Sequence, residues 1–142
     1  MTFVVSFPVN CLPVPKGRPR FRKTKNFVQT YTPKKTLDFE DLVRTRAKEA
    51  MGSSEPLDGP IEAFFFIRLP VPQSYSKKRS KACLEGLESP IKRTDLDNYA
   101  KSILDAMNEV VYKDDSQVIS LHIKKIYAAD PGVDILVREY IR

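Results

Sequence analysis

Four aspartates and one lysine in the second half of the chain have the types and spacing of a hydrolytic metal site. Asp95 and Asp97 are two residues apart, and Lys101 follows one helical turn later. Asp114 and Asp115 come next, after the apolar run VVY. Carboxylates that converge on one place repel one another, and burial adds a desolvation cost to each. Because a divalent cation removes that conflict, the sequence predicts a metal site here.

The chemistry of these ligands favours a hard ion. Residues 93–118 contain no Cys or His, and oxygen ligands alone suit Mg²⁺, with Mn²⁺ as a substitute. Such an ion polarises a phosphoryl oxygen and lowers the pKa of a bound water, which is the chemistry of phosphodiester hydrolysis. Lys101 can place its ammonium group on the same phosphate. We therefore expect the catalytic group to comprise Asp95, Asp97, Lys101 and either Asp114 or Asp115.

A purely structural interpretation of the same residues stays open. Asp97 has the type of a helix N-cap, and Lys101 and Asp105 have the i,i+4 spacing of a surface ion pair. Asp114 and Asp115 are also common residues in polar turns. A DxD pair alone is weak, because it also binds metal in sugar-nucleotide transferases, but those enzymes are larger. The combination of all these residues favours the metal site.

The helix that positions this group is predicted over residues 98–108. On a wheel of 100° per residue, one arc of about 100° is apolar and forms the buried stripe: Leu96, Tyr99, Ala100, Ile103 and Met107. An adjacent arc is polar: Asp97, Lys101, Asp105 and Asn108. Asp95 and Asp97 point the same way if the stretch before the helix is extended. Asp105 is then a helix-surface partner of Lys101.

Periodicity and turn residues predict the other elements. Strands are expected at 2–7, 61–70, 118–127 and 133–141. One helix is expected to have Thr32 as N-cap and Pro33 as its first residue and to end at Gly52, and a short helix is expected near 77–84. The first strand is expected to end at Pro8. Residues 8–35 form a connection long enough to be functional, with a hairpin around residues 27–31. This order indicates an α+β fold, a single domain over residues 1–142 with a mixed β-sheet packed against two main helices.

Basic residues surround the acidic stretch. Residues 16–35 carry eight Lys/Arg and no acid, with three aromatic residues interleaved. Arginine and lysine at this density are typical of a loop that follows a phosphate backbone, although solvated loop charges are the alternative. Further clusters occur at 77–81 and 92–93. The residues we expect to bind DNA are Lys16, Arg18, Arg20, Arg22, Lys77, Lys78, Arg79, Lys92 and Arg93.

The composition agrees with a nucleic-acid partner. The chain has 142 residues, with 24 Lys+Arg against 18 Asp+Glu, and a basic surplus favours polyanions. Cys11 and Cys83 are far apart and indicate reduced thiols, while the lone His122 excludes a multi-histidine zinc site. The N-terminus lacks the features of a signal peptide, and no apolar run approaches the roughly 20 residues of a membrane span. We therefore expect a cytoplasmic protein.

These residues resemble the RusA family of Holliday-junction resolvases, endodeoxyribonucleases of bacteria and their phages. The similarity runs in family order through four segments: PVPKGRPRF (13–21), YTPKKTLDFEDLV (31–43), PQSYSKKRSKACLEG (72–86) and RTDLDNYAKSILDAMNEVVYKDDSQV (93–118). The last segment is the most specific, since it combines DxDN, a lysine four residues after the second Asp, and DDxQV. Two departures lie in stretches that could touch DNA: Thr94 precedes the first Asp, and Tyr75 stands where a Trp is expected.

The resemblance implies a Mg²⁺-dependent homodimer that cuts four-way junctions symmetrically during DNA recombination and repair, in a bacterial cell or, if phage-encoded, in its host. It implies Asp95, Asp97 and Asp115 as metal ligands, with Asp114 as second choice, and Lys101 as the catalytic lysine. A branched-DNA nuclease of broader specificity and a non-catalytic DNA-binding protein are the alternatives.

Overall fold

The structure is a computed structural model that describes residues 3–17, 20–23, 28–31 and 33–141. Its elements, in chain order, are β1 (Val4–Val9), β2 (Arg20–Lys23), β3 (Val28–Tyr31), α1 (Lys34–Met51), β4 (Ile61–Leu69), α2 (Lys77–Leu84), α3 (Leu96–Ala106), the 3₁₀ turn η1 (Asp115–Gln117), β5 (Val118–Tyr127) and β6 (Gly132–Glu139).

Four strands form a mixed sheet in the order β1-β6-β4-β5. β6 is antiparallel to both β1 and β4, whereas β5 is parallel to β4. A parallel pair needs a long crossover connection, and here that crossover contains α2 and α3. The fold is therefore α+β with a mixed sheet, as the sequence predicts.

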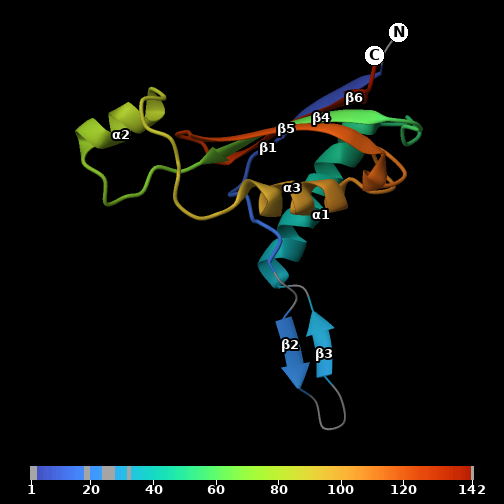
Figure 1. Ribbon diagram of the computed structural model, residues 1–142, viewed down its shortest axis with the longest axis horizontal. Coiled ribbons are helices and arrows are strands. Elements are labelled where there is room, and N and C mark those ends of the chain that lie inside the picture. Colours follow the sequence, from blue (N-terminus) through green and yellow to red (C-terminus); the bar gives the residue numbers. More distant parts are fainter. Residues whose placement is uncertain (1–2, 18–19, 24–27, 32, 142) are drawn as a thin grey trace.

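Helices α1 and α3 lie on the same side of this sheet (Figure 1). Alternate residues of the inner strands point towards them and are fully buried, among them Phe65, Ile135 and Val137. Phe39 and Val43 of α1 and Ile103 of α3 complete the core. The opposite face of the sheet has no helix over it in Figure 1. α3 packs on this core through the apolar stripe that the helical wheel predicts.

Several predicted element ends are wrong by one or two residues. α3 spans Leu96–Ala106 instead of 98–108, and β6 spans Gly132–Glu139 instead of 133–141. β1 continues through Pro8, which pairs with Asp134; a proline is tolerated there because β1 is an edge strand, with one side of its backbone unpaired. α1 has Pro33 itself as N-cap, so Pro33 is not the first helical residue, and Thr32 lies outside the described residues. The helix stops at Gly52, as expected, with a positive φ of 57°.

The predicted hairpin is present, since β2 and β3 form a separate two-stranded antiparallel sheet. It extends away from the main sheet, beyond the N-terminal end of α1 (Figure 1). Cys11 and Cys83 are both free thiols, as predicted. None of the helices in the described ranges is long and apolar enough to cross a membrane.

Candidate active site

α3 begins with two acidic residues in its first turn. Asp95 is the N-cap, with extended backbone dihedrals, but its carboxylate makes no capping hydrogen bond. Asp97 is the second residue of the helix, so the predicted extended stretch through Asp97 and the alternative of Asp97 as N-cap are both wrong. Both side chains are exposed at the helix end where the peptide dipoles favour negative charge. They are therefore accessible to a ligand.

Lys125 of β5 fixes the segment that leads into α3. Its ammonium group donates to the carbonyl oxygens of Lys92 (3.1 Å) and Thr94 (2.9 Å). The Thr94 hydroxyl also lies 2.8 Å from the hydroxyl of Tyr99 in the first turns of the helix. The start of α3 is thus anchored to the sheet by a lysine that sequence patterns do not single out, because a lysine in an edge strand usually faces water.

A tight turn after α3 returns the chain towards the helix. Glu109 has a positive φ of 65°, which is uncommon for a residue with a side chain. Val111 and Tyr112 are fully buried beyond it, and the Tyr112 hydroxyl donates to the carbonyl of Leu104 at 2.7 Å. This apolar anchor brings the following aspartates back to the C-terminal end of the helix.

The two adjacent aspartates then have different roles in the fold. Asp114 caps η1: its carboxylate accepts from the Ser116 amide at 3.0 Å, and hydrogen bonding by Ser116 lowers its pKa. Gln117 completes the turn: its side chain accepts from the amides of Lys113 and Asp114. It also donates to the carbonyls of Leu57 and Gly59, in the loop between α1 and β4. The final Gln of the DDxQV motif is therefore a turn residue.

The Asp115 carboxylate lies close to two other carboxylates. Burial raises the pKa of its carboxyl group, and the neighbouring carboxylates of Asp105 and Asp114 raise it further. A hydrogen bond from the Asn108 side chain opposes that shift. The Oδ1 atom of Asn108 is itself buried and has no hydrogen-bond partner within the described part of the chain. An additional cation at this place would be favourable, because it would relieve the repulsion.

Lys16 places a positive charge beside Asp105, the neighbour of Asp115. Its ammonium group lies 2.7 Å from Glu40 Oε1 on α1 and 3.3 Å from Asp105 Oδ2. Burial lowers the pKa of Lys16, but the hydrogen bonds and charges of Glu40 and Asp105 outweigh it, so the pKa is raised. The expectation that Asp105 pairs with Lys101 is therefore wrong. The sequence could not reveal this pair, since its members are 89 positions apart.

The segment around Lys16 is also anchored through its backbone. The Lys16 amide donates to the Asn98 carbonyl at 2.8 Å. The buried hydroxyl of Ser102 donates to the Val14 carbonyl at 2.9 Å. Residues 14–16 therefore run along α3, and the first strand of the hairpin begins at Arg20.

The predicted aspartates lie in two places: Asp95 and Asp97 at the start of α3, and Asp114 and Asp115 beyond its end, where Asp115 lies beside Asp105. Asp97 and Asp105 are eight residues apart, or about 12 Å along the helix axis. Within the described ranges, no group of three or more His, Cys, Asp or Glu side chains is close enough to hold a metal ion. The donors at both ends are oxygen atoms, which suit a hard divalent ion, and the crowded Asp115 and the unpaired Asn108 oxygen fit such an ion.

The structure places the predicted DNA-binding residues of the second half of the chain in different surroundings. Lys77, Lys78 and Arg93 are exposed. Arg79 is engaged within the chain, since it forms an ion pair with Glu88 at 2.6 Å and stacks over Tyr75 at 3.6 Å. Lys92 lies 5.4 Å from the same ring. Arg18 lies outside the described residues, as do the side chains of Arg20 and Arg22 on β2.

Comparison with known proteins gives three matches. Residues 10–138 match the family model described as endodeoxyribonuclease RusA. The uncharacterized protein YqaN of Bacillus subtilis (strain 168) is 34% identical over 137 residues, covering 95% of this chain and 96% of that protein. The crossover junction endodeoxyribonuclease rusA of Lactococcus phage r1t is 27% identical over 143 residues, covering 98% and 99% of the two chains. The similarity therefore includes both ends of α3 and the turn that follows it.

Proposed function

Because the chain belongs to the RusA family of endodeoxyribonucleases, we propose that it resolves four-way DNA junctions by Mg²⁺-dependent phosphodiester hydrolysis. Family membership implies a nuclease that acts on Holliday junctions. The metal, the residues that bind it, the homodimer and the role in recombination and repair are the further content of this proposal.

Asp95, Asp97 and Asp115 are the proposed ligands of Mg²⁺, for which Mn²⁺ can substitute. Because Asp115 lies beside the other end of α3 in this structure, sharing one ion would require its turn to move towards Asp95 and Asp97 on binding. A bound Mg²⁺ would polarise the scissile phosphate and lower the pKa of a water. Lys101 lies on the polar side of α3, one turn after Asp97 and one turn before Asp105. From there its ammonium group can neutralise charge that develops on the phosphate in the transition state.

The crowding at Asp115 is the observation that carries this proposal. A half-buried carboxylate with a raised pKa, beside a second carboxylate, costs stability in an apo protein and is typical of functional sites. The Asp114 carboxylate already accepts the hydrogen bond that caps η1, so Asp115 is the favoured metal ligand of the two. α3 contacts β5, the edge strand of the sheet, and η1 directly precedes that strand.

DNA binding is assigned to the basic segments around this site. The exposed Lys77 and Lys78 start α2, and Arg93 immediately precedes the acidic stretch. The hairpin after Lys16 carries further Arg and Lys residues. Contacts from these residues to phosphates would position the duplex arms without reading their sequence. A homodimer suits the substrate, because a four-way junction is approximately two-fold symmetric.

The experiment is a comparison of branched substrates under one condition. Four-way, three-way, flap and linear duplex DNA, each labelled at the 5′ ends, are incubated with the protein in Mg²⁺, in Mn²⁺ and in EDTA. We expect paired, symmetric cuts in the four-way junction with either metal and none in EDTA. The Asp97→Asn variant is the matched control for contaminating nucleases.

Each other outcome contradicts the proposal at a defined point. Equal cutting of flaps or three-way DNA would show a nuclease of broader specificity. Salt-sensitive binding without product in any divalent ion would show a DNA-binding protein that is not an enzyme. Cutting that persists in EDTA would remove the metal from the mechanism.

A further inference from the structure

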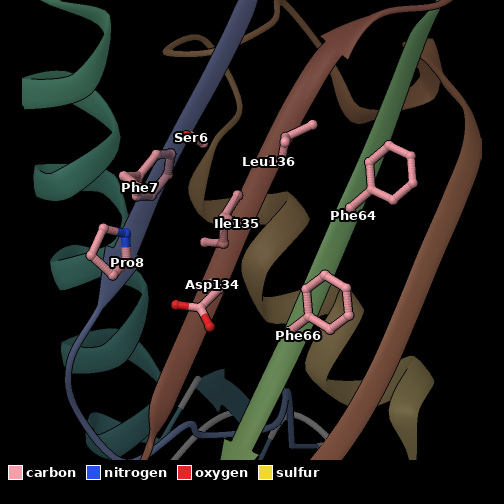
Figure 2. A pocket seen from close by; sticks show the side chains of 8 residues that line it. All are labelled: Ser6, Phe7, Pro8, Phe64, Phe66, Asp134, Ile135 and Leu136. Carbon is pink, nitrogen blue, oxygen red and sulfur yellow. The ribbon is translucent and has the colours of Figure 1, made fainter.

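Two adjacent lysines of β5 point to opposite faces of the sheet. Lys124 is the register neighbour of Phe66 on β4, and Lys125 is the register neighbour of Ile67. Phe66 points away from the helices, as Figure 2 shows, and is 46% exposed, whereas Ile67 is fully buried in the core. Because successive side chains of a strand alternate between the two faces, Lys125 lies on the side of α3 and Lys124 on the open side.

Lys125 holds a segment that has no other backbone anchor. Residues 91–94 lead from the loop after α2 into α3, and they form no backbone–backbone hydrogen bond to any residue that the structure describes. The Lys125 ammonium group donates to the carbonyl oxygens of Lys92 at 3.1 Å and Thr94 at 2.9 Å. A charged donor makes stronger hydrogen bonds than a neutral one, so this side chain fixes the curve of the segment.

The Thr94 carbonyl is one rigid peptide away from Asp95. The peptide plane joins this carbonyl to the amide and the Cα atom of Asp95, so a hydrogen bond to the oxygen also sets where the Asp95 side chain begins. The Thr94 hydroxyl lies 2.8 Å from the hydroxyl of Tyr99, a residue that is only 4% exposed. Thr94 is therefore held through both its backbone and its side chain.

The Asp95 carboxylate depends on this backbone for its position. Asp95 is the N-cap of α3, but its side chain makes no capping hydrogen bond of its own. Asp97 follows in the first turn of the helix, so its place relative to Asp95 depends on the angle at which the segment enters α3. An ion that binds both carboxylates gains affinity when they are already in place, because ordering flexible groups on binding costs free energy.

We propose that Lys125 is a positioning residue for the metal site at the start of α3, and that it holds Asp95 and Asp97 in place through the Thr94 carbonyl. This inference rests on the proposed function, because it takes both aspartates to be Mg²⁺ ligands. Replacing a partner that orients a metal ligand typically lowers metal affinity by about 10- to 100-fold. Lys125 acts through the backbone of one ligand, so the lower figure is expected.

The first test uses the free protein, so its result depends on neither metal nor nuclease activity. Backbone ¹⁵N relaxation should give an order parameter of about 0.85 for the Asp95 amide in the wild type, and a value below about 0.6 in Lys125→Met. Lys124→Met, on the opposite face of the sheet, is the matched control and should keep the wild-type value. An Asp95 amide that is equally rigid in Lys125→Met, or already flexible in the wild type, would overturn the proposal.

A second measurement on the wild type keeps the proposal falsifiable if Lys125→Met does not fold. The ammonium protons of Lys125 donate to two carbonyls, whereas Lys124 is exposed. The Lys125 protons should therefore exchange with water at least about tenfold more slowly than those of Lys124. Equal exchange rates at the two ammonium groups would show that Lys125 does not hold the segment.

The last test separates metal affinity from the chemical step. The Mg²⁺ concentration for half-maximal junction cleavage should rise about tenfold in Lys125→Met, while the rate at saturating Mg²⁺ stays within about threefold of the wild type. Lys125→Arg keeps a charged donor and should return the half-maximal concentration to within about threefold of the wild type. Lys124→Met should leave both quantities unchanged.

The possible failures point to different errors. A half-maximal Mg²⁺ concentration that stays unchanged in Lys125→Met would overturn this inference and leave the proposed function intact. So would a junction Kd in Ca²⁺ that rises with no change in the Mg²⁺ requirement, because Lys125 would then be a DNA contact. Cleavage by the wild type that needs no divalent ion would overturn the proposed function and this inference together.

Discussion

The two ends of α3 hold their carboxylates in opposite ways. At the start, Asp95 and Asp97 are exposed, and the Asp95 carboxylate makes no capping hydrogen bond. At the end, Asp105 and Asp115 are half-buried, with Lys16 and Asn108 beside them. The exposed end is ready for a ligand, whereas the half-buried end carries a repulsion that a cation would relieve. Free carboxylates and electrostatic repulsion, which would each favour a bound cation, therefore occur at different ends of one helix.

The largest expected effect separates the two adjacent aspartates at the half-buried end. Asp115→Asn should lower the single-turnover rate of junction cleavage by about 10³-fold, because the metal loses a ligand. Asp114→Asn should keep the rate within about tenfold, since that carboxylate caps η1. Rates at saturating Mg²⁺ and on preformed protein–junction complexes measure this. Equal losses in the two variants would assign no separate role to Asp115.

A smaller loss is expected from the lysine between the two ends. Lys101→Met should lower the cleavage rate by about 10²-fold, because transition-state charge is no longer neutralised. The Kd for the junction, measured in Ca²⁺ to prevent turnover, should stay nearly unchanged. If the Kd rises in step with the loss of rate, Lys101 binds ground-state phosphate instead.

Substituting Lys16 tests whether its ion pairs with Glu40 and Asp105 stabilise the C-terminal end of α3. Lys16→Met should lower the free energy of unfolding by about 1 kcal/mol, because charged hydrogen bonds to two carboxylates are lost and solvent screens part of their strength. Since the folded pKa of Lys16 is raised, this contribution is complete below the unfolded pKa of about 10.4. It disappears as the pH rises through the folded pKa.

Urea unfolding of wild type and Lys16→Met at neutral pH and near pH 11 measures that difference. The difference in unfolding free energy between the two proteins should be smaller at the higher pH, because the loss begins above the unfolded pKa. Lys35→Met, at an exposed position on α1, is a matched control that should leave stability unchanged. A junction Kd that rises in Lys16→Met with no change in stability would make Lys16 a DNA contact, as the sequence alone suggests.

The smallest expected effect concerns the metal-free protein. The pKa of Asp115 is raised, so its charged form costs stability above the unfolded pKa, and that cost falls as the pH drops through the folded pKa. Asp115→Asn should therefore raise the Tm in EDTA at pH 7 by about 1–3 °C, and this gain should vanish at acidic pH. Asp114→Asn should lower the Tm, because a cap is lost. A lower Tm for Asp115→Asn would show that its carboxylate is well paired.

Local patterns predicted the elements well where the signal is local. The alternation over residues 118–127 gives β5 to the residue, and the apolar stripe places α3 on the core. The first and last residues of the strands and helices were harder to predict. Pro8, for example, fits within a strand only at the edge of a sheet, and the sequence does not show which strands lie at the edges. Asp105 was misassigned for the same reason: helical spacing offered Lys101 as a partner, while Lys16 arrives from a distant segment.

The candidate site residues and the family are visible in the sequence: which carboxylates and lysine are present, their spacing along the chain, and the basic segments. These depend on residue types and short-range periodicity, which need no tertiary contacts. The folded structure is needed to see that Asp114 caps a turn while Asp115 lies beside other carboxylates, that Lys16 bridges α1 and α3, and that no helix covers one face of the sheet. Burial and charge pairing depend on which distant segments the core brings together, and no local pattern contains that information.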